Sequence, residues 1–346
     1  MNPENNLTMY DHKVAIGLVT YNARNYLPFC LNSLQEQGFK DYQILIVDNG
    51  STDGTLAYLS EKFPHYKVVA HKDNIGFSKA FNQIILWTKS EYLFCVNQDT
   101  ILDRDYLSNA INFLDQHLDV AGISGKLYQW DYQDNVKTTM IDSVGLIIKK
   151  NHQVLDRGNG QADQGQYNQV EEVFGVSGAL PIYRRQALEE IKLKNKQGYD
   201  EYFDESYFAY KEDVDLSWRL RLAGWKLYCL PQSIAYHDRT VAGAVHKTDW
   251  QVATAHRKKN ILINFLSYRN HLLTIYKNEF ALNFWKYFLY IVPYELKKYL
   301  FMLLFNRVSR SKFRNFWQLY PQMRYKRKQI SKMIKVKPQT ISKWYQ

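Results

Sequence analysis

Four short acidic segments follow one another along the chain and constrain its fold more than any other feature. They are VDNGSTDGT at 47–55, VNQDT at 96–100, KEDVDLSWRL at 211–220 and AYHD at 235–238. The first two each follow an apolar run, which is typical of a buried parallel strand that delivers a carboxylate to the carboxyl edge of a sheet. Because open α/β sheets bind ligands at that edge, we expect these segments to meet there.

The first 125 residues alternate between strand and helix patterns. Apolar runs predict strands, and helical periodicity falls between them. This spacing favours βαβ crossovers and a mostly parallel, doubly wound α/β sheet with flanking helices. The predicted strands are 14–19, 43–48, 66–71, 91–99 and 120–125, and the predicted helices include 26–37, 79–88 and 104–117.

The pattern changes after residue 126. We expect a hairpin at 142–156, a strand at 173–183, a helix at 204–224 and a strand at 227–231, followed by a helical extension. We therefore predict one unit at 1–245, which changes character at about residue 126, and a C-terminal helical region at 246–346.

The positive charge is confined to the tail. From Leu296 to Gln346 there are 14 Lys and Arg and no Asp or Glu, whereas the first 295 residues hold 31 basic and 34 acidic side chains. Such asymmetry indicates an anionic partner, either a membrane surface or a nucleic acid. No motif of a nucleic-acid-binding module accompanies the basic tail, which makes nucleic acid the less favoured partner.

The cysteines and the N-terminus indicate the compartment. Cys30, Cys95 and Cys229 are isolated and form no CxxC pair, as expected in a reducing environment. The polar start, MNPENNLTMYDHK, has no apolar core of an export signal. We therefore expect a cytoplasmic protein, at the inner face of the cell membrane if its tail binds lipid.

Over roughly residues 12–240 the chain resembles glycosyltransferase family 2, which has the GT-A fold. The motifs that carry the resemblance occur in the family's order. The segment FDESYFAYKEDVDLSWRLRLAGW is most similar to the bacterial rhamnosyltransferase-like branch. The motifs are TYN at 20–22, VDNGSTDGT at 47–55, DNIGFSKAFN at 73–82, NQDT at 97–100, the FDE segment at 203–225 and His237.

The resemblance implies an enzyme that transfers a sugar from a nucleotide-sugar donor with inversion. Its acceptor would be a saccharide or a lipid-linked saccharide in the assembly of O-antigen, capsule or cell wall. The branch implies dTDP-rhamnose as donor, and a galactofuranosyl or hexosyl transferase that uses a UDP-sugar is the alternative. An NAD-dependent oxidoreductase would share the α/β pattern, but no GxGxxG follows the first strand.

The resemblance implies a GT-A catalytic domain at 1–245, with a nucleotide-binding half at about 12–125 and an acceptor half with the catalytic base at about 126–245. It places the nucleotide sugar along the first strands. Asp48 would accept a hydrogen bond from the imide N–H of the base, with Ser51 nearby, although helix capping by Ser51 or Asp53 is the alternative. Thr20 and Asn22 would contact the base or ribose, unless they serve only the turn. The full donor set is Thr20, Asn22, Asp48, Asn49, Ser51, Asn74, Gly76, Lys79 and Asn97, with Asn82 as an alternative to Lys79 at the phosphates.

A divalent cation is implied at Asp99. An ionised side chain at the end of a buried strand needs a partner, and Mg²⁺ or Mn²⁺ bridging two phosphates would supply it. His237 would complete the coordination, or else be structural. The motif commonly reads Asp-x-Asp in the family, whereas Asn97 takes the first position here.

The catalytic base is expected in the third acidic segment. The family's base maps to Asp213, and Glu212 is the neighbouring alternative. Aromatic and apolar residues flank them, so partial burial should raise their pKa toward the working pH, as a general base requires. The nearby Arg219 and Arg221 would contact phosphate or form salt bridges within the helix.

The tail segment FWKYFLYIVPYELKKYLFMLLF at 284–305 is aromatic and apolar but interrupted by charges and Pro293. It is therefore not expected to span a membrane. Residues 284–346 are expected to contact the membrane surface through amphipathic helices and basic side chains. A helical extension packed on the catalytic unit is the alternative.

Overall fold

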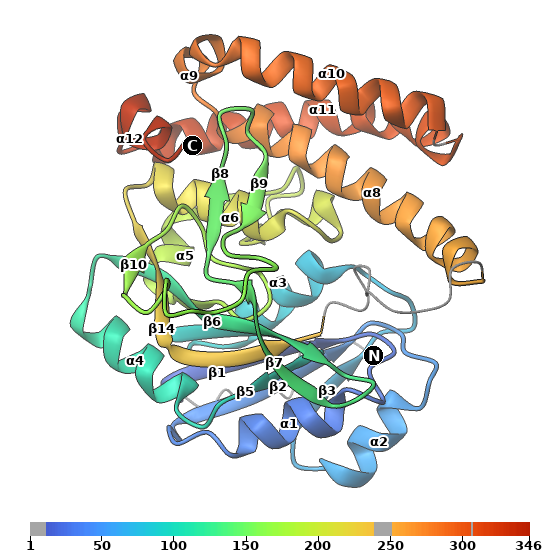
Figure 1. The fold of residues 1–346 in the computed structure, drawn as a ribbon, viewed down its shortest axis with the longest axis vertical. Coiled ribbons are helices and arrows are strands. Elements are labelled where there is room, and N and C mark those ends of the chain that lie inside the picture. The colour runs from blue at the N-terminus through green and yellow to red at the C-terminus, as the bar shows by residue number, and fades with distance from the viewer. Residues whose placement is uncertain (1–11, 239–250, 306) are drawn as a thin grey trace.

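A computed structural model describes residues 12–238, 251–305 and 307–346, and its centre is one large sheet (Figure 1). The apolar runs near the N-terminus form its strands, as their length and burial predict. Two small hairpins, β8–β9 and β12–β13, stand apart from it. The strands are β1 (Val14–Thr20), β2 (Tyr42–Asp48), β3 (Lys67–Ala70), β4 (Tyr92–Asn97), β5 (Thr100–Leu102), β6 (Val120–Asp131), β7 (Val136–Ser143), β8 (Leu146–Ile148), β9 (Val154–Asp156), β10 (Glu171–Glu172), β11 (Ile182–Arg184), β12 (Leu193–Lys194), β13 (Asp200–Glu201) and β14 (Lys226–His237).

The strand order is β10-β14-β6-β11-β4-β1-β2-β3, with β5 and β7 paired to β14 and β6. The neighbours β1–β2, β1–β4, β2–β3 and β6–β14 are parallel. β11 lies antiparallel between β4 and β6. The sheet is therefore mostly parallel around β1, and the predicted α/β architecture is confirmed.

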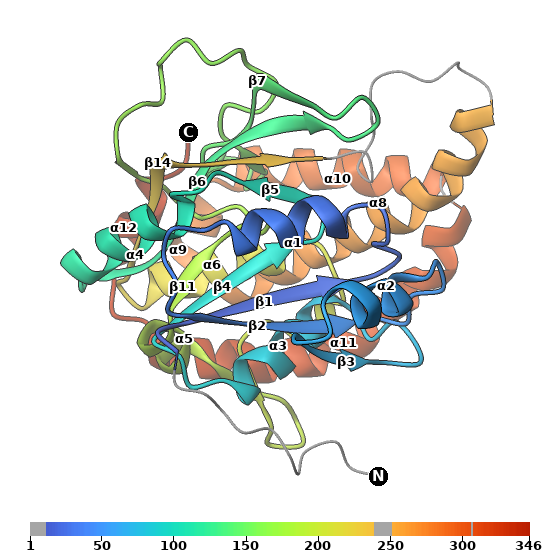
Figure 2. The same cartoon turned by 90° about the horizontal axis from the view of Figure 1, so that it is seen from below.

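Helices cover both faces of the sheet (Figure 2). On one face, alternate β1 residues pack against α1 (Leu27–Gln35), α2 (Thr55–Lys62) and α4 (Tyr106–Gln116). On the other face, the core is made with α3 (Phe77–Trp87), α5 (Arg185–Ile191) and α6 (Glu212–Leu222). Burial on both faces explains why these strands read as continuous apolar runs rather than as alternating ones.

Two predicted elements in the second half differ from the structure. Of the predicted 173–183 strand, only Ile182 and Tyr183 belong to β11. The carbonyls of Ala179 and Pro181 still accept hydrogen bonds from β4, but Pro181 has no N–H with which to complete the ladder. The helix predicted from residue 204 begins at Glu212. Phe208, Tyr210 and Lys211 have φ between 64° and 72°, which a right-handed helix cannot accommodate.

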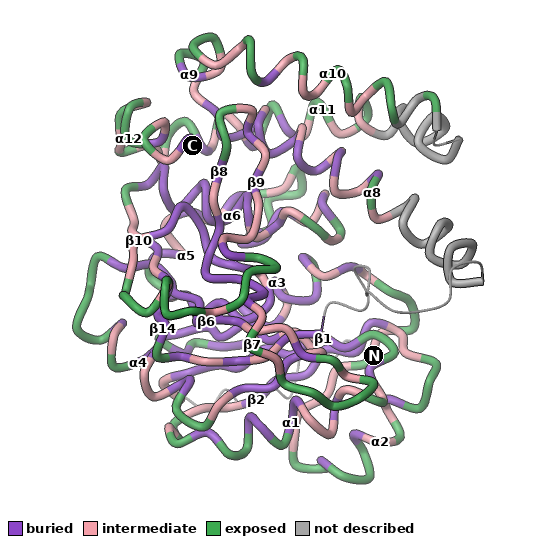
Figure 3. The backbone as a smooth tube through the Cα atoms, in the orientation of Figure 1, coloured by how far each residue is buried: buried purple, intermediate pink, exposed green. Residues whose placement is uncertain are grey.

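Five C-terminal helices form a layer at the end of the molecule away from α1 and α2 (Figure 1). Within the described residues, none of the helices has the length and apolarity needed to cross a membrane. Burial along them is uneven, since α10 has many exposed positions (Figure 3). The helices are α8 (Gln251–Asn278), α9 (Ala281–Lys286), α10 (Phe288–Phe305), α11 (Arg307–Met333) and α12 (Pro338–Ser342).

Two buried lysines attach this layer to α6 and the segment before it. Lys277 of α8 contacts Asp204 and lies 2.9 Å from Asp215, and Lys326 of α11 lies 2.6 Å from Asp204. All four side chains are fully buried. For α8 and α11, the structure thus agrees with the alternative in which the tail packs on the rest of the protein.

Candidate active site

A cavity of about 390 Å³ lies at the carboxyl end of β4. It gathers five of the predicted site residues, which come from segments far apart in the sequence. The other predicted donor-binding residues do not line it. The five are Asn97, Asp99, Glu212, Asp213 and His237.

Asp48 ends β2, but its carboxylate is fully buried and bonded locally. Oδ1 accepts hydrogen bonds from the hydroxyls of Thr20 (2.9 Å) and Ser51 (2.6 Å), and Oδ2 accepts one from the Ser51 N–H at 2.9 Å. These bonds fix the loop after β2 against the end of β1. The geometry shows that Asp48 organises this loop, and its contact with the nucleobase of the donor stays a prediction.

The loops that follow β1 and β2 are joined by a hydrogen-bond network. The Asn22 N–H donates to Ser51 Oγ at 2.8 Å, and Asn22 Oδ1 accepts from the Thr52 N–H at 2.9 Å. Asp53 accepts hydrogen bonds from both the N–H and the hydroxyl of Thr55 at the start of α2. The N-cap itself is Gly54, which has no side-chain cap bond, so Asp53 serves the turn before the helix. The network joins the two loops at this edge of the sheet.

The segment DNIGFSKAFN contacts the loop before α6, which contains Phe208. Asn74 closes an Asx turn on the Gly76 N–H (2.9 Å), and Asn49 Nδ2 donates to the Gly76 carbonyl at 3.4 Å. Gly76 has φ +90°, and a Cβ there would lie 2.6 Å from the Phe208 ring. Glycine is therefore required for this close approach.

The two candidates for phosphate contact differ in exposure. Lys79 is exposed on α3. Asn82 is buried, and its amide bonds the backbone of Tyr202 and Phe203. Of the two, only Lys79 has its side chain open to solvent.

Asp99 and His237 lie together in the cavity, with His237 Nε2 3.4 Å from Asp99 Oδ1. His237 Nδ1 is 2.9 Å from Oδ2 of the fully buried Asp142. Burial lowers the pKa of His237, but the charges of Asp99 and Asp142 outweigh it and raise the pKa to about 10. At neutral pH the imidazole is therefore positively charged, with both ring nitrogens protonated, and it lies between two carboxylates.

This arrangement fits a divalent cation with few protein ligands. Metal-binding histidines commonly donate their second ring N–H to a carboxylate, the place that Asp142 takes here. A cation would displace the proton at Nε2. Within the described ranges, no three His, Cys, Asp or Glu residues cluster so as to hold an ion. A cation at Asp99 and His237 would thus depend on phosphate and water for its other ligands, as Mg²⁺ often does.

Glu212 and Asp213 open α6 at the cavity wall. Asp213 Oδ2 accepts a hydrogen bond from the Gly178 N–H at 3.1 Å, and Oδ1 accepts one from the Val214 N–H at 2.8 Å. Burial and the neighbouring Asp213 raise the pKa of Glu212 to about 8. Burial also raises the pKa of Asp213, against the effect of Lys211. The two neighbouring carboxyl groups therefore hold a shared proton more readily than isolated ones would.

Glu212 also has an oxygen without a hydrogen-bond partner. Its side chain is buried, and Oε2 has no partner within the described part of the chain. Buried polar atoms without partners are rare and are often found at functional sites. A hydroxyl group in the cavity could form a hydrogen bond with this oxygen.

The loop before α6 is held by a residue that the sequence analysis did not identify. Asn270 of α8 donates through Nδ2 to the carbonyls of Tyr207 (3.0 Å), Ala209 (2.9 Å) and Tyr210 (2.7 Å). These bonds stabilise backbone that has positive φ at Tyr210 and Lys211. No motif surrounds Asn270, so only the tertiary structure reveals its place.

Arg219 and Arg221 are buried and occupied within the fold. Arg219 lies 3.0 Å from Asp215 and donates to the carbonyls of Ile191 and Tyr202. Arg221 bonds Glu172 and nearby carbonyls. Neither lines the cavity. The expected salt bridge within the helix is present for Arg219, whereas Arg221 pairs outside the helix with Glu172 of β10.

The comparisons with known proteins agree with this geometry. A family model described as glycosyl transferase family 2 matches residues 15–192. The chain is 26% identical over 244 residues to an N-acetylglucosaminyl-diphospho-decaprenol L-rhamnosyltransferase of Mycobacterium tuberculosis, covering 64% of this chain and 74% of that protein. It is 30% identical over 101 residues to the glycosyltransferase GlyA of Streptococcus pneumoniae, covering 29% of this chain but only 14% of that protein.

A solved structure resembles the fold. GalNAc-T7, crystallised with UDP, GalNAc and Mn²⁺, matches with a TM-score of 0.56 over 77% of this chain and 48% of that chain, at 12% identity. At this identity the likeness concerns the fold alone. The GT-A fold expected from the sequence is thereby confirmed.

Proposed function

The chain belongs to glycosyl transferase family 2, and from this premise we propose that it is an inverting enzyme that moves a sugar from a nucleotide-sugar donor to an acceptor hydroxyl. The observation that supports this best is the cavity that Asp99 and His237 share with Glu212 and Asp213. A carboxylate with a raised pKa lies there in the same space as the candidate cation ligands.

In this proposal Asp213 is the base. Its carboxylate takes the proton of the acceptor hydroxyl while the acceptor oxygen forms a bond to the anomeric carbon. The bond from that carbon to the donor diphosphate breaks, and the diphosphate leaves with the electron pair. Glu212, protonated at neutral pH, keeps a second negative charge away from Asp213. A positioned base contributes roughly 10²–10⁴-fold to such a rate.

We propose Asp99 and His237 as the ligands of Mg²⁺ or Mn²⁺. When bound, the cation supplies Lewis-acid stabilisation of the departing diphosphate. Asp142 orients the His237 ring through its 2.9 Å contact with Nδ1. Asn97, in place of a second aspartate, contributes an uncharged side chain to the same wall of the cavity.

For the donor we propose dTDP-rhamnose, with a UDP-hexose or UDP-galactofuranose as the alternative. The support is the likeness to the mycobacterial enzyme, whose name specifies an L-rhamnosyl group and a diphospho-decaprenol acceptor. The corresponding acceptor is a saccharide, free or lipid-linked, in the synthesis of a cell-surface polysaccharide. The predicted donor contacts along the edge of β1 and β2, Asp48 foremost, belong to this proposal.

The remaining predictions concern place and organisation. We propose that the protein acts at the cytoplasmic face of the membrane, with residues 284–346 as the contact region. We also propose that the chain divides into a catalytic domain at 1–245 and a C-terminal helical region at 246–346. Nucleic acid is a poorer partner for this region, because Lys277 and Lys326 are buried in ion pairs with Asp215 and Asp204 and are not available to phosphates.

A donor-cleavage screen tests the proposal without knowledge of the acceptor. The purified chain is incubated with dTDP-rhamnose, UDP-galactofuranose and UDP-glucose, each with Mn²⁺ or with EDTA, and released nucleoside diphosphate is measured. We expect release from dTDP-rhamnose with Mn²⁺ and its loss with EDTA. Cleavage of a UDP-sugar instead would show that the donor is not dTDP-rhamnose. Equal cleavage in EDTA would show that the reaction does not depend on a metal ion. No cleavage of any donor would contradict the proposed function.

A further inference from the structure

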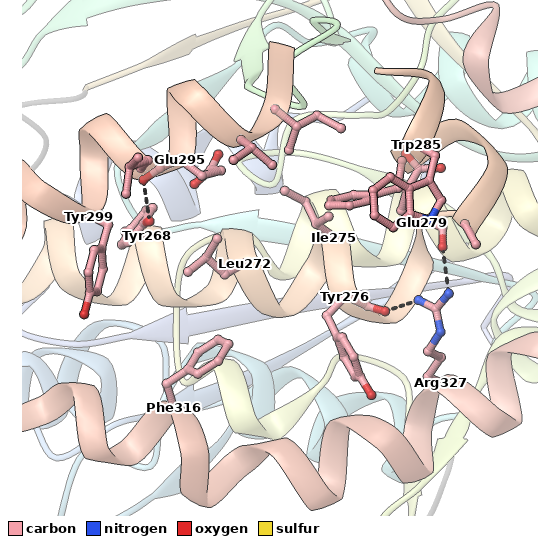
Figure 4. A pocket seen from close by; sticks show the side chains of 15 residues that line it. Tyr268, Leu272, Ile275, Tyr276, Glu279, Trp285, Glu295, Tyr299, Phe316 and Arg327 are labelled. Atoms are coloured by element: carbon pink, nitrogen blue, oxygen red, sulfur yellow. Dashed lines mark hydrogen bonds between the residues drawn. The ribbon is translucent and has the colours of Figure 1, made fainter. Parts of the chain in front are cut away.

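A second cavity, of about 670 Å³, lies between the C-terminal helices and outside the active site (Figure 4). Most of its lining is apolar or aromatic, including Leu272 and Ile275 of α8, Leu296 and Tyr299 of α10 and Phe316 of α11. Its volume is within the roughly 300–1,000 Å³ of small-molecule sites. We call it the α8–α10 groove.

Most polar groups in the groove are occupied by the protein itself, and Glu295 Oε2 is an exception without a partner among the described residues. Arg327 donates to the carbonyls of Tyr276 and Glu279. Glu295 Oε1 is 2.8 Å from His271 Nε2, and the Tyr268 hydroxyl donates to the Glu295 carbonyl at 3.0 Å. A polar ligand would lose hydration here without enough compensating bonds. The surface instead suits hydrocarbon.

The groove adjoins the active site through α8. Ser267 lines the catalytic cavity, and the next residue, Tyr268, lines the groove. One helix therefore forms a wall of both spaces. A molecule with a long chain could lie in the groove and extend its head past α8 toward Asp213.

Two lysines lie along this path. Lys298 of α10 is half-buried, with Nζ 4.5 Å from the centre of the Tyr294 ring and 5.7 Å from that of Tyr268. Lys211 lines the catalytic cavity. Neither forms an ion pair with a carboxylate within 12–238, 251–305 or 307–346. Burial lowers the pKa of both lysines, although Asp213 and Asp156 act against it at Lys211 and Glu295 acts against it at Lys298. The charge of Lys298 also lowers the pKa of Lys211, so the two cations are near each other and an anion between them would stabilise both.

We propose that the α8–α10 groove binds the hydrocarbon chain of a lipid-linked saccharide acceptor, whose phosphate groups contact Lys298 and Lys211 while its sugar enters the catalytic cavity. This inference rests on the proposed glycosyl transfer and names the acceptor class for it. The absence of Asp and Glu from Leu296 to Gln346 complements the negative charge of such a lipid and disfavours a second copy of this basic region as occupant.

Farnesyl diphosphate is a suitable soluble probe, since it combines a hydrocarbon chain with a diphosphate. Its affinity for the full chain is measured by calorimetry, with inorganic diphosphate and farnesol as the separate halves. We expect farnesyl diphosphate to bind at least about tenfold more tightly than either half, because chain and phosphates contact different parts of one site.

Two exposed leucines of α10 give matched variants. Leu296 is 52% exposed and lines the groove, whereas Leu289 is 81% exposed and does not. Leu296→Glu should weaken farnesyl diphosphate at least about tenfold, and Leu289→Glu should change it less than about twofold. Lys298→Met should weaken farnesyl diphosphate but leave farnesol unchanged.

Wild-type affinity in Leu296→Glu, or binding of inorganic diphosphate as tight as that of the farnesyl compound, would overturn the inference. If both leucine variants bind the probe normally and lose only attachment to anionic vesicles, the helix is a membrane-docking surface and the groove proposal is also wrong. Donor cleavage is measured in parallel. Absence of donor cleavage in the wild type would contradict the proposed function. The probe affinities would still show whether the α8–α10 groove binds a hydrocarbon chain.

Discussion

The two sides of the active site are held in different ways. On the donor side, the loops after β1 and β2 bond to each other, with partners 28 to 32 residues apart, as in Thr20–Asp48 and Ala23–Thr55. On the base side, the loop before α6 is held by α8, with partners 60 to 63 residues apart. The donor edge is organised by neighbouring segments, whereas the base depends on a distant helix.

The carboxyl groups on the two sides differ in how their oxygens are satisfied. Asp48 accepts three hydrogen bonds from its own edge of the sheet. Glu212 keeps an oxygen without a partner in the described structure, and the loop that leads to it has positive φ at non-glycine residues. The donor side has similar features, since Asn22 has positive φ and Asn49 Oδ1 has no partner among the described residues. Because α8 holds the loop before α6, changes at α8 should affect catalysis more than donor binding.

The largest effect is expected from Asp213→Asn. The amide keeps the shape of the side chain but cannot accept the acceptor's proton, so kcat should fall roughly 10²–10⁴-fold. Nucleotide affinity should stay within about twofold, because the donor side is built separately. Initial rates and calorimetric titration with nucleotide measure the two quantities. Wild-type turnover in this variant would remove Asp213 as the base and reopen the role of Glu212.

Lys277→Met tests whether α8 anchors the base side. The substitution leaves the fully buried Asp204 and Asp215 short of a cation, and breaking such a buried pair typically costs about 3–5 kcal/mol of unfolding free energy. Chemical denaturation measures this. Lys62→Met is the matched control, because Lys62 and its partner Glu61 are exposed and such pairs contribute little to stability. Equal losses in both variants would contradict an anchoring role.

The donor edge could be predicted from the sequence because its signals are local. Each apolar run ends in a polar residue at the same edge, so Asp48 and Asn97 could be placed without tertiary information. The same reasoning could not tell that Asp48 would be fully buried, since its partner Thr20 belongs to another strand. Local patterns locate an edge, but they do not show which bonds a side chain makes there.

The base side could be predicted only in part. The acidic run marked Glu212 and Asp213, but a helix from residue 204 was expected because the pattern does not reveal positive φ at Phe208, Tyr210 and Lys211. Asn270 and Asp142 have no neighbouring motif, and their roles follow from side-chain contacts across 60 and 95 residues. Long-range bonds of this kind leave no periodic signal in a sequence.

A smaller effect is expected at the candidate cation site. Asp142→Asn removes the charge beside His237 Nδ1, and changes at such supporting carboxylates typically reduce metal affinity about 10–100-fold. Titration of Mn²⁺ in the presence of nucleoside diphosphate measures the affinity directly. Asp163→Asn is a control, because Asp163 binds Lys126 outside the catalytic cavity. Unchanged Mn²⁺ affinity in the Asp142 variant would show that His237 is not held as a ligand.

The smallest of the four effects is expected from Asn270→Ala, and it probes the contrast between the two sides most directly. Loss of the amide leaves the carbonyls of Tyr207, Ala209 and Tyr210 without this donor. A net value of about 1 kcal/mol per hydrogen bond, divided between stability and positioning, suggests a fall in kcat of about tenfold. The KM for the donor should change little.

The pH profile separates positioning from a general loss of stability. Burial raises the pKa values of Glu212 and Asp213, so a loosened loop that admits water should lower them. Because a general base acts in its deprotonated form, the acidic limb of the kcat profile should then move to lower pH. Asn264→Ala, at an exposed position of the same helix, should leave both kcat and the profile unchanged. If Asn270→Ala lowers the melting temperature but keeps the wild-type profile, then α8 supports the fold without setting the chemistry of the base.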